Sequence, residues 1–218
     1  MALLSDRCSK CGRSPPEGLK ACSKCHGATG IYCSKECQVA HWKLHKKICH
    51  PLSDGEVWGI KILDNRYAPW SRQFQHVLLK KTHPVFTVGE LCPVTDLCGM
   101  PLLILSERVH GGHRALNDNQ PAVYLRIEPD NALAPMHWQI DSVGMCIVAR
   151  KDRKPLTLEA IEIIYKFHSH LIHTIDDERL EDGSRWKRPI SPEWLREFAD
   201  EYREKETRQG RLGFDYFP

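Results

Sequence analysis

Seven cysteines and one histidine, placed at regular spacing, crowd the first fifty residues of this 218-residue chain. They form four pairs, each with two or three residues between its members: Cys8/Cys11, Cys22/Cys25, Cys33/Cys37 and His45/Cys49. A structural zinc ion takes four Cys or His ligands, commonly as pairs at such spacings. The eight side chains therefore predict two complete tetrahedral zinc sites.

Clustered cysteines can instead form disulfides, which need an oxidising compartment. A secreted chain would begin with a basic segment, an apolar stretch and a cleavage site, but here Met1–Leu4 is followed at once by Ser5, Asp6 and Arg7. Without such a leader, paired Cys-x-x-Cys motifs are more typical of metal binding than of disulfides. We therefore expect two bound Zn²⁺ ions and an intracellular protein, in the nucleus or the cytoplasm.

Helix geometry partly decides which ligands share an ion. Ser34 suits an N-cap, and residues 37–48 contain no Gly or Pro, which predicts a short helix. His45 and Cys49 are four residues apart and would project from one face of it. Cys37 and His45 are eight residues apart, so at about 1.5 Å per residue they lie roughly 12 Å apart along the axis. Those two side chains cannot bind the same ion.

The helix is therefore expected to begin at one ion and end at the other, with the earlier pairs divided between the two. An interleaved arrangement meets this condition, with zinc 1 bound by Cys8, Cys11, Cys33 and Cys37, and zinc 2 bound by Cys22, Cys25, His45 and Cys49. A sequential arrangement would leave the last four ligands to span the same distance, and we reject it.

The later ligands form the pattern Cys33-x3-Cys37-Gln38-x3-Trp42-x2-His45-x3-Cys49, preceded by two Cys-x2-Cys pairs. This pattern resembles a MYND zinc finger, with Tyr32 also at its usual place. The resemblance implies a small, interleaved (cross-brace) module with two zinc ions that mediates protein–protein interaction, commonly by docking a proline-containing peptide and often in transcriptional regulators. It implies a role in the peptide groove for Gln38 and Trp42, although Trp42 could simply pack in so small a module.

Charge gives little support for nucleic acid as the partner. Residues 1–50 carry nine Lys/Arg against three Asp/Glu, a formal +6 that seven thiolates and two Zn²⁺ ions reduce to about +3. A nucleic-acid site would want a larger basic stripe with interleaved base-reading residues. Contact with DNA, in a transcription regulator, is kept as an alternative.

The composition changes after the cysteine-rich segment. We expect a zinc finger over residues 1–50, a turn-rich linker over 51–56, and an α+β domain of unknown role over 57–218. Strands are predicted at 57–63, 100–105, 122–127 and 143–149, and helices at 70–81 (weakly), at 157–175 with Thr157 as N-cap, and from Ser191 onward. No run is long and apolar enough to span a membrane, so no membrane partner is expected.

The α+β domain shows no convincing catalytic motif. We expect His168, His170 and His173 to be exposed, Cys92, Cys98 and Cys146 to be buried as small apolar residues, and segments 110–113 and 117–120 to form a loop and a turn. Its pattern resembles that of fungal MYND-finger proteins, a likeness that implies no activity. Some SET-domain methyltransferases carry a MYND finger inside the catalytic domain. In such an enzyme part of the catalytic domain precedes the finger, whereas only seven residues precede Cys8 here. The Asn-His-Ser type motif is also absent, so the sequence does not favour this class.

These observations predict a zinc-binding adaptor, not an enzyme, whose finger binds a protein partner through a proline-containing motif. The alternatives are a transcription regulator that contacts DNA, a SET-type methyltransferase, and a small-molecule or catalytic role for the second domain. A pocket lined by converging polar groups would favour the last of these.

Overall fold

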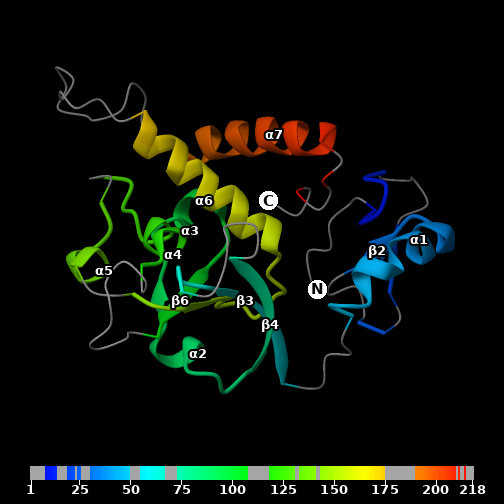
Figure 1. Cartoon of the computed structure of the whole chain (residues 1–218), viewed down its shortest axis with the longest axis horizontal. Coiled ribbons are helices and arrows are strands. Elements are labelled where there is room, and N and C mark those ends of the chain that lie inside the picture. The colour runs from blue at the N-terminus through cyan, green and yellow to red at the C-terminus, as the bar shows by residue number, and fades with distance from the viewer. Residues whose placement is uncertain are drawn as a thin grey trace.

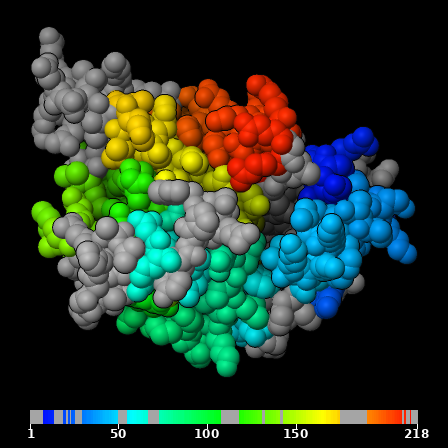
Figure 2. All heavy atoms as spheres, in the orientation of Figure 1, coloured from blue at the N-terminus to red at the C-terminus, as the bar shows by residue number. Residues whose placement is uncertain are grey.

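Two structural units follow one another along the chain, a small metal-ligand module and a larger α+β unit, and in Figure 1 they lie side by side. The space-filling view places the module at one end of the molecule (Figure 2). The computed structural model describes residues 8–13, 19–22, 24–25, 30–49, 55–66, 73–107, 118–130, 133–140, 143–174, 190–209, 211 and 214.

In its described residues, the small unit consists of a two-stranded sheet and one helix. Strand β1 (Lys20–Ala21) pairs antiparallel with β2 (Ile31–Tyr32), and helix α1 (Lys35–His45) follows directly. The side chain of Ser34 caps α1 by accepting a hydrogen bond from the backbone N–H of Cys37 at 3.2 Å, as predicted. The helix ends three residues earlier than expected, and a turn over residues 46–48 then leads to Cys49.

The larger unit is built on an antiparallel sheet, which confirms the predicted α+β class. Its strand order is β4-β3-β7-β6-β5. The strands are β3 (Glu56–Ile62), β4 (Phe74–Lys80), β5 (Glu90–Leu91), β6 (Leu102–Ser106) and β7 (Cys146–Arg150). The strands predicted at 57–63, 100–105 and 143–149 correspond to β3, β6 and β7. Residues 51–54 of the predicted linker lie outside the described residues, so the domain boundary stays a prediction.

Two predicted elements are wrong. The described part of the helix expected over 70–81 is strand β4, which pairs with β3 from Glu56↔Lys80 to Ile62↔Phe74. Long-range pairing here overrides a weak local helical preference. The strand expected over 122–127 is instead helix α4 (Gln120–Tyr124), which Asn119 caps by accepting a hydrogen bond from the backbone N–H of Ala122. Asn119 belongs to the predicted turn over 117–120, and residue 117 lies outside the described part of the chain.

Helices cover both faces of the sheet. One face packs against α6 (Leu158–His173), which Thr157 caps as predicted, and α7 (Pro192–Arg208), capped by Ser191, packs on α6. The short helix α2 (Val85–Val88) covers part of the opposite face (Figure 1). Two more short helices, α3 (Thr95–Cys98) and α5 (Met136–Ile140), complete the unit.

Alternate residues of the central strands face α6 and form the main core. Its strand residues are Ile60, Ile62, Leu102, Ile104, Cys146 and Val148. The prediction that Cys92, Cys98 and Cys146 are buried is confirmed, and burial raises the pKa of the Cys92 thiol to about 12. Among the described helices, none has the length and apolar character to cross a bilayer.

The prediction that three α6 histidines are exposed is wrong for His168. Its ring lies inside the core, and its Nδ1 is 3.0 Å from the carbonyl oxygen of Ile164, to which it donates a hydrogen bond as a neutral imidazole. The helical pattern could have shown this, because His168 lies one turn after the buried Ile164. Burial lowers the pKa of His168 from 6.5 to about 4.

Because of this low pKa, the larger unit should lose stability in acid. Between pH 6.5 and 4 the unfolded chain binds a proton that folded His168 does not, so the stabilisation present above pH 6.5 is lost as pH falls. We expect wild type to lose roughly 3 kcal/mol more than His168→Met between pH 7 and pH 4, measured by urea unfolding. His173→Met, at an exposed position of α6, should behave like wild type, and equal pH dependence in all three would contradict the assignment.

Candidate metal centre

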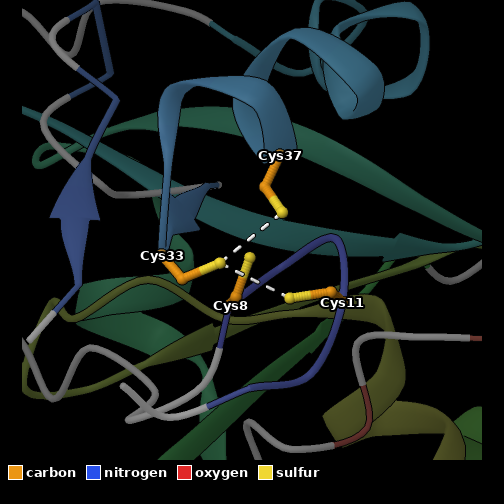
Figure 3. Close-up of side chains that lie close together, drawn as sticks. All are labelled: Cys8, Cys11, Cys33 and Cys37. Carbon is orange, nitrogen blue, oxygen red and sulfur yellow. Dashed lines mark hydrogen bonds between the residues drawn. The ribbon is translucent and has the colours of Figure 1, made fainter. Parts of the chain in front are cut away.

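The zinc 1 site is formed by four cysteine sulfurs from three segments of the chain. Cys8 and Cys11 lie in a tight N-terminal turn, Cys33 follows β2, and Cys37 lies in the first turn of α1. The Cys33 sulfur is 3.5 Å from the Cys11 sulfur and 3.5 Å from the Cys37 sulfur (Figure 3). A tetrahedron with Zn–S bonds of about 2.3 Å has sulfur–sulfur edges of about 3.8 Å, so the spacing fits a zinc ion.

Backbone hydrogen bonds fix the N-terminal turn. The N–H of Cys8 donates to the Arg13 carbonyl and the N–H of Gly12 donates to the Cys8 carbonyl, each at 2.8 Å. Gly12 has a φ of 69°, which favours glycine because other residues rarely adopt it. A hydrogen bond of 2.8 Å from the N–H of Ser9 to the Ile31 carbonyl then holds the turn against β2.

The zinc 2 site is formed by three cysteines and one histidine, all of them buried. The sulfurs of Cys22 and Cys49 are 3.7 Å apart, and the Cys25 sulfur is 3.7 Å from Nε2 of His45. These distances again match the edges of a zinc tetrahedron. The histidine presents Nε2, so Nε2 is the atom that would bind the ion.

Each set brings its four ligand atoms within 4.8 Å of one another, and the two sets have the interleaved membership that helix geometry predicts. Cys37 at the start of α1 belongs to zinc 1, and His45 at its end belongs to zinc 2. His41 belongs to neither set, and its Nδ1 is instead 3.0 Å from the hydroxyl of Tyr32. Two further histidines considered near the ligands, at 26 and 50, lie outside the described residues.

Gly30 allows the chain to pass close to the zinc 2 ligands. A Cβ atom at this position would lie 2.6 Å from the Tyr32 hydroxyl oxygen and 2.7 Å from Cε1 of His45. Neither ring can move away easily, since both are buried. The N–H of Cys22 donates to the Gly30 carbonyl at 3.0 Å, so this glycine also positions a ligand.

The sulfur pKa values show why these sets need a cation. Burial opposes ionisation of Cys22, but hydrogen bonds from the Cys25 backbone and from His45 outweigh it and lower the pKa of Cys22 to about 6. Burial and the neighbouring Cys22 sulfur raise the pKa of Cys49 to about 12. In zinc 1, the Cys11 and Cys37 sulfurs raise the pKa of Cys33 to about 12. Four thiolates in zinc 1, or three thiolates beside the His45 imidazole in zinc 2, can lie so close together only with a positive charge between them.

Two zinc ions fit the residues present, and each ion would have four protein ligands. A closed tetrahedral site leaves no position for water or substrate, which is the arrangement of structural zinc sites. The ions would therefore supply folding free energy to a unit whose apolar core is very small.

The two predicted peptide-binding residues lie one turn apart on α1. Trp42 is 41% exposed, and its ring centroid is 5.7 Å from that of His45. Gln38 is half-buried, and its neighbour Val39 is 66% exposed. Trp42 thus packs on a zinc 2 ligand with one part of its indole and meets solvent with another.

Comparison with known proteins agrees with the ligand geometry. Residues 8–49 match the MYND finger family. Over 49 residues the chain is 43% identical to the "Dauer abnormal formation protein 25" of Caenorhabditis elegans, an alignment that covers 22% of this chain and 11% of that protein. No solved structure matches the chain. The likeness to that relative is therefore restricted to the finger and a few adjoining residues.

Paired substitutions test the interleaved ligand sets. The double variant Cys8→Ser/Cys37→Ser removes two ligands from one ion, so it should lose about one equivalent of zinc and keep the other. The variant Cys8→Ser/Cys49→Ser takes one ligand from each ion and should lose up to two equivalents. Elemental analysis of the purified full chain measures both. Loss of two equivalents by the first variant would contradict the pairing, because Cys8 and Cys37 would then belong to different ions.

Substitution of Gly30 should weaken zinc 2 selectively. In Gly30→Ala the added methyl group collides with Tyr32 and His45, so about one of the two ions should be lost at a lower concentration of a competing chelator. Zinc 1 provides the internal control. Unchanged release of both ions would show that the close approach at Gly30 does not matter.

Proposed function

We propose that the MYND finger formed by residues 8–49 makes this protein an intracellular adaptor that docks a short proline-containing segment of a partner. The observation that carries the proposal is the partly exposed indole of Trp42, one helical turn after the amide of Gln38. MYND fingers generally mediate protein–protein interaction, and both side chains are at positions that form the peptide groove in the family. Zinc-bound thiolates are also best maintained in a reducing compartment.

The metal sites would make α1 a rigid platform. Cys37 ties its first turn to one ion and His45 ties its last residue to the other. A surface fixed before binding loses little conformational entropy when a ligand docks, which favours affinity. In Figure 1, α1 lies on the side of the finger away from the sheet, where a partner can reach it.

The chemistry of this surface suits a polyproline II segment. Such a helix exposes its backbone carbonyls and packs its proline rings on aromatic side chains. Trp42 offers the aromatic face, Gln38 offers an amide that can donate to a peptide carbonyl, and the exposed Val39 extends the apolar area. Recognition of this kind needs no catalytic group, so we infer a binding role for the chain and not an enzymatic one.

A peptide titration against the full, zinc-loaded chain tests the proposal. Peptides with consecutive prolines should bind wild type, and Trp42→Ala should weaken binding at least about tenfold because it removes the aromatic face. Gln38→Ala should weaken it less. Leu44→Ala is the matched control, since Leu44 is a 61% exposed apolar residue on the opposite side of α1.

The measurement needs two checks. Each variant must retain two equivalents of zinc, because Trp42 also contacts a zinc 2 ligand. The same peptides with alanine in place of proline should bind poorly. Equal affinity of wild type and Trp42→Ala for the proline peptides would remove the proposed site, and a steeply salt-dependent affinity for DNA would favour the transcription-regulator alternative.

A further inference from the structure

A pocket of about 700 Å³ lies in the larger unit, lined by α6, α7 and the start of β4. Its volume is within the range of sites for small ligands. Some polar groups that line the pocket form hydrogen bonds or ion pairs and others have no such partner among the described residues. The unpartnered groups indicate which ligand would complement the pocket. The argument rests only on this unit and is independent of the finger's role.

Gln73 is the first such group. Its side chain is buried, 3% exposed, and its Nε2 donates to the Leu63 carbonyl at 3.2 Å, while its Oε1 has no hydrogen-bond partner among the residues that the structure describes. A buried amide oxygen without a partner is unfavourable, because it gave up water on folding and gained nothing in return. The pocket therefore contains a fixed acceptor that requires a donor.

Glu159 is the second. It lies in the first turn of α6, lines the pocket as a half-buried carboxyl group, and forms no ion pair within the described parts of the chain. Burial and the nearby Glu162 raise the pKa of its carboxyl group to about 7, against an opposing effect of Arg211, so a cation placed beside Glu159 would favour its ionised form.

The guanidinium that lines the pocket is already saturated. Arg211 donates to both carboxylate oxygens of Glu162, at 2.9 and 2.7 Å, and to Glu206 at 2.6 Å. The Tyr202 hydroxyl also donates to Glu162 at 2.7 Å. Two carboxylates therefore neutralise the charge of Arg211, and its guanidinium does not attract an anion into the interior of the pocket.

A metal ion does not fit this site. Two of the pocket's carboxylates, Glu162 and Glu206, converge on the Arg211 guanidinium, and within the described residues only the two Cys/His sets bring three or more ligand atoms close together. The pocket is also much larger than one ion needs. Aromatic rings suit an organic cation better: those of Phe74 and Tyr165 meet edge to face at 6.1 Å, and the Nζ of Lys166 already lies 5.2 Å from the centroid of the Tyr165 ring.

We propose that this pocket binds a small molecule carrying a guanidinium or alkylammonium group, whose N–H groups donate to Gln73 and pair with Glu159. Lys166 and Lys205, both exposed, line the same pocket and favour an anionic group at the other end of the ligand. The preferred ligand is therefore a zwitterion with a cationic nitrogen inside and a carboxylate or phosphate at the rim.

Calorimetric titration of the full chain with 4-guanidinobutyrate tests the proposal, with 4-ureidobutyrate as its uncharged-head counterpart and butylguanidinium as the counterpart lacking a carboxylate. We expect 4-guanidinobutyrate to bind, butylguanidinium to bind more weakly, and the ureido compound to bind at least about tenfold more weakly. Glu159→Gln should weaken 4-guanidinobutyrate at least about tenfold. Glu201→Gln, which changes an exposed carboxylate of α7, is the matched control.

Two variants distinguish the contribution of the pocket interior to ligand affinity from that of its rim. Gln73→Met should weaken both guanidinium compounds, whereas Lys205→Ala should weaken only the one that carries a carboxylate. Thermal unfolding shows whether Gln73→Met remains folded, since it also loses the hydrogen bond to Leu63. Equal binding of the guanidinium and ureido compounds, wild-type affinity in Glu159→Gln, or no binding of either guanidinium compound at millimolar concentration would overturn the proposal.

Discussion

Tetrahedral coordination at the two ends of one short helix is the constraint on which the N-terminal unit depends. Helix α1 supplies a ligand to zinc 1 near its start and a ligand to zinc 2 at its end. The rest of this unit consists of strands of two residues and tight turns, whose described buried apolar residues are few apart from the ligands themselves. Packing in such a module cannot offset the loss of chain entropy, so the metal–ligand bonds must contribute the difference.

The assignment of Cys37 and His45 to different ions was predictable, because the number of residues in a helix fixes its length. Cys37 and His45 are eight positions apart on one helix, and no change of side-chain conformation brings them to one ion. The same reasoning was less successful beyond the helix. Cys49 was expected on a continuing helical face, but α1 ends at His45 and a turn carries Cys49 to the ion instead. The prediction that His45 and Cys49 share an ion is confirmed, because it depends only on the short distance between them. The exact end of a helix depends instead on local hydrogen bonding.

In the larger unit, prediction succeeded where local signals were strong. Thr157 and Ser191 cap long helices with a clear apolar face, and both helices are present. Prediction failed where the secondary structure of a segment is determined by pairing with a strand elsewhere in the sequence. The residues of β4 form a strand because β3 lies beside them, and nothing within that segment alone states this. The pocket was equally hidden, because Gln73 and Glu159 are far apart in the sequence and only the packing of β4 against α6 brings them to one cavity.

The crossed order of the ligands also has a consequence for synthesis of the chain. The last ligand of zinc 1 is Cys37 and the last ligand of zinc 2 is Cys49, so a growing polypeptide completes one coordination set before the other. By that time Cys22 and Cys25 have already been made, and they await His45 and Cys49 while the first ion is being enclosed. The ligands thus become available in a fixed order, and the set that includes the first turn of α1 is complete before the set that ends past the carboxyl end of that helix.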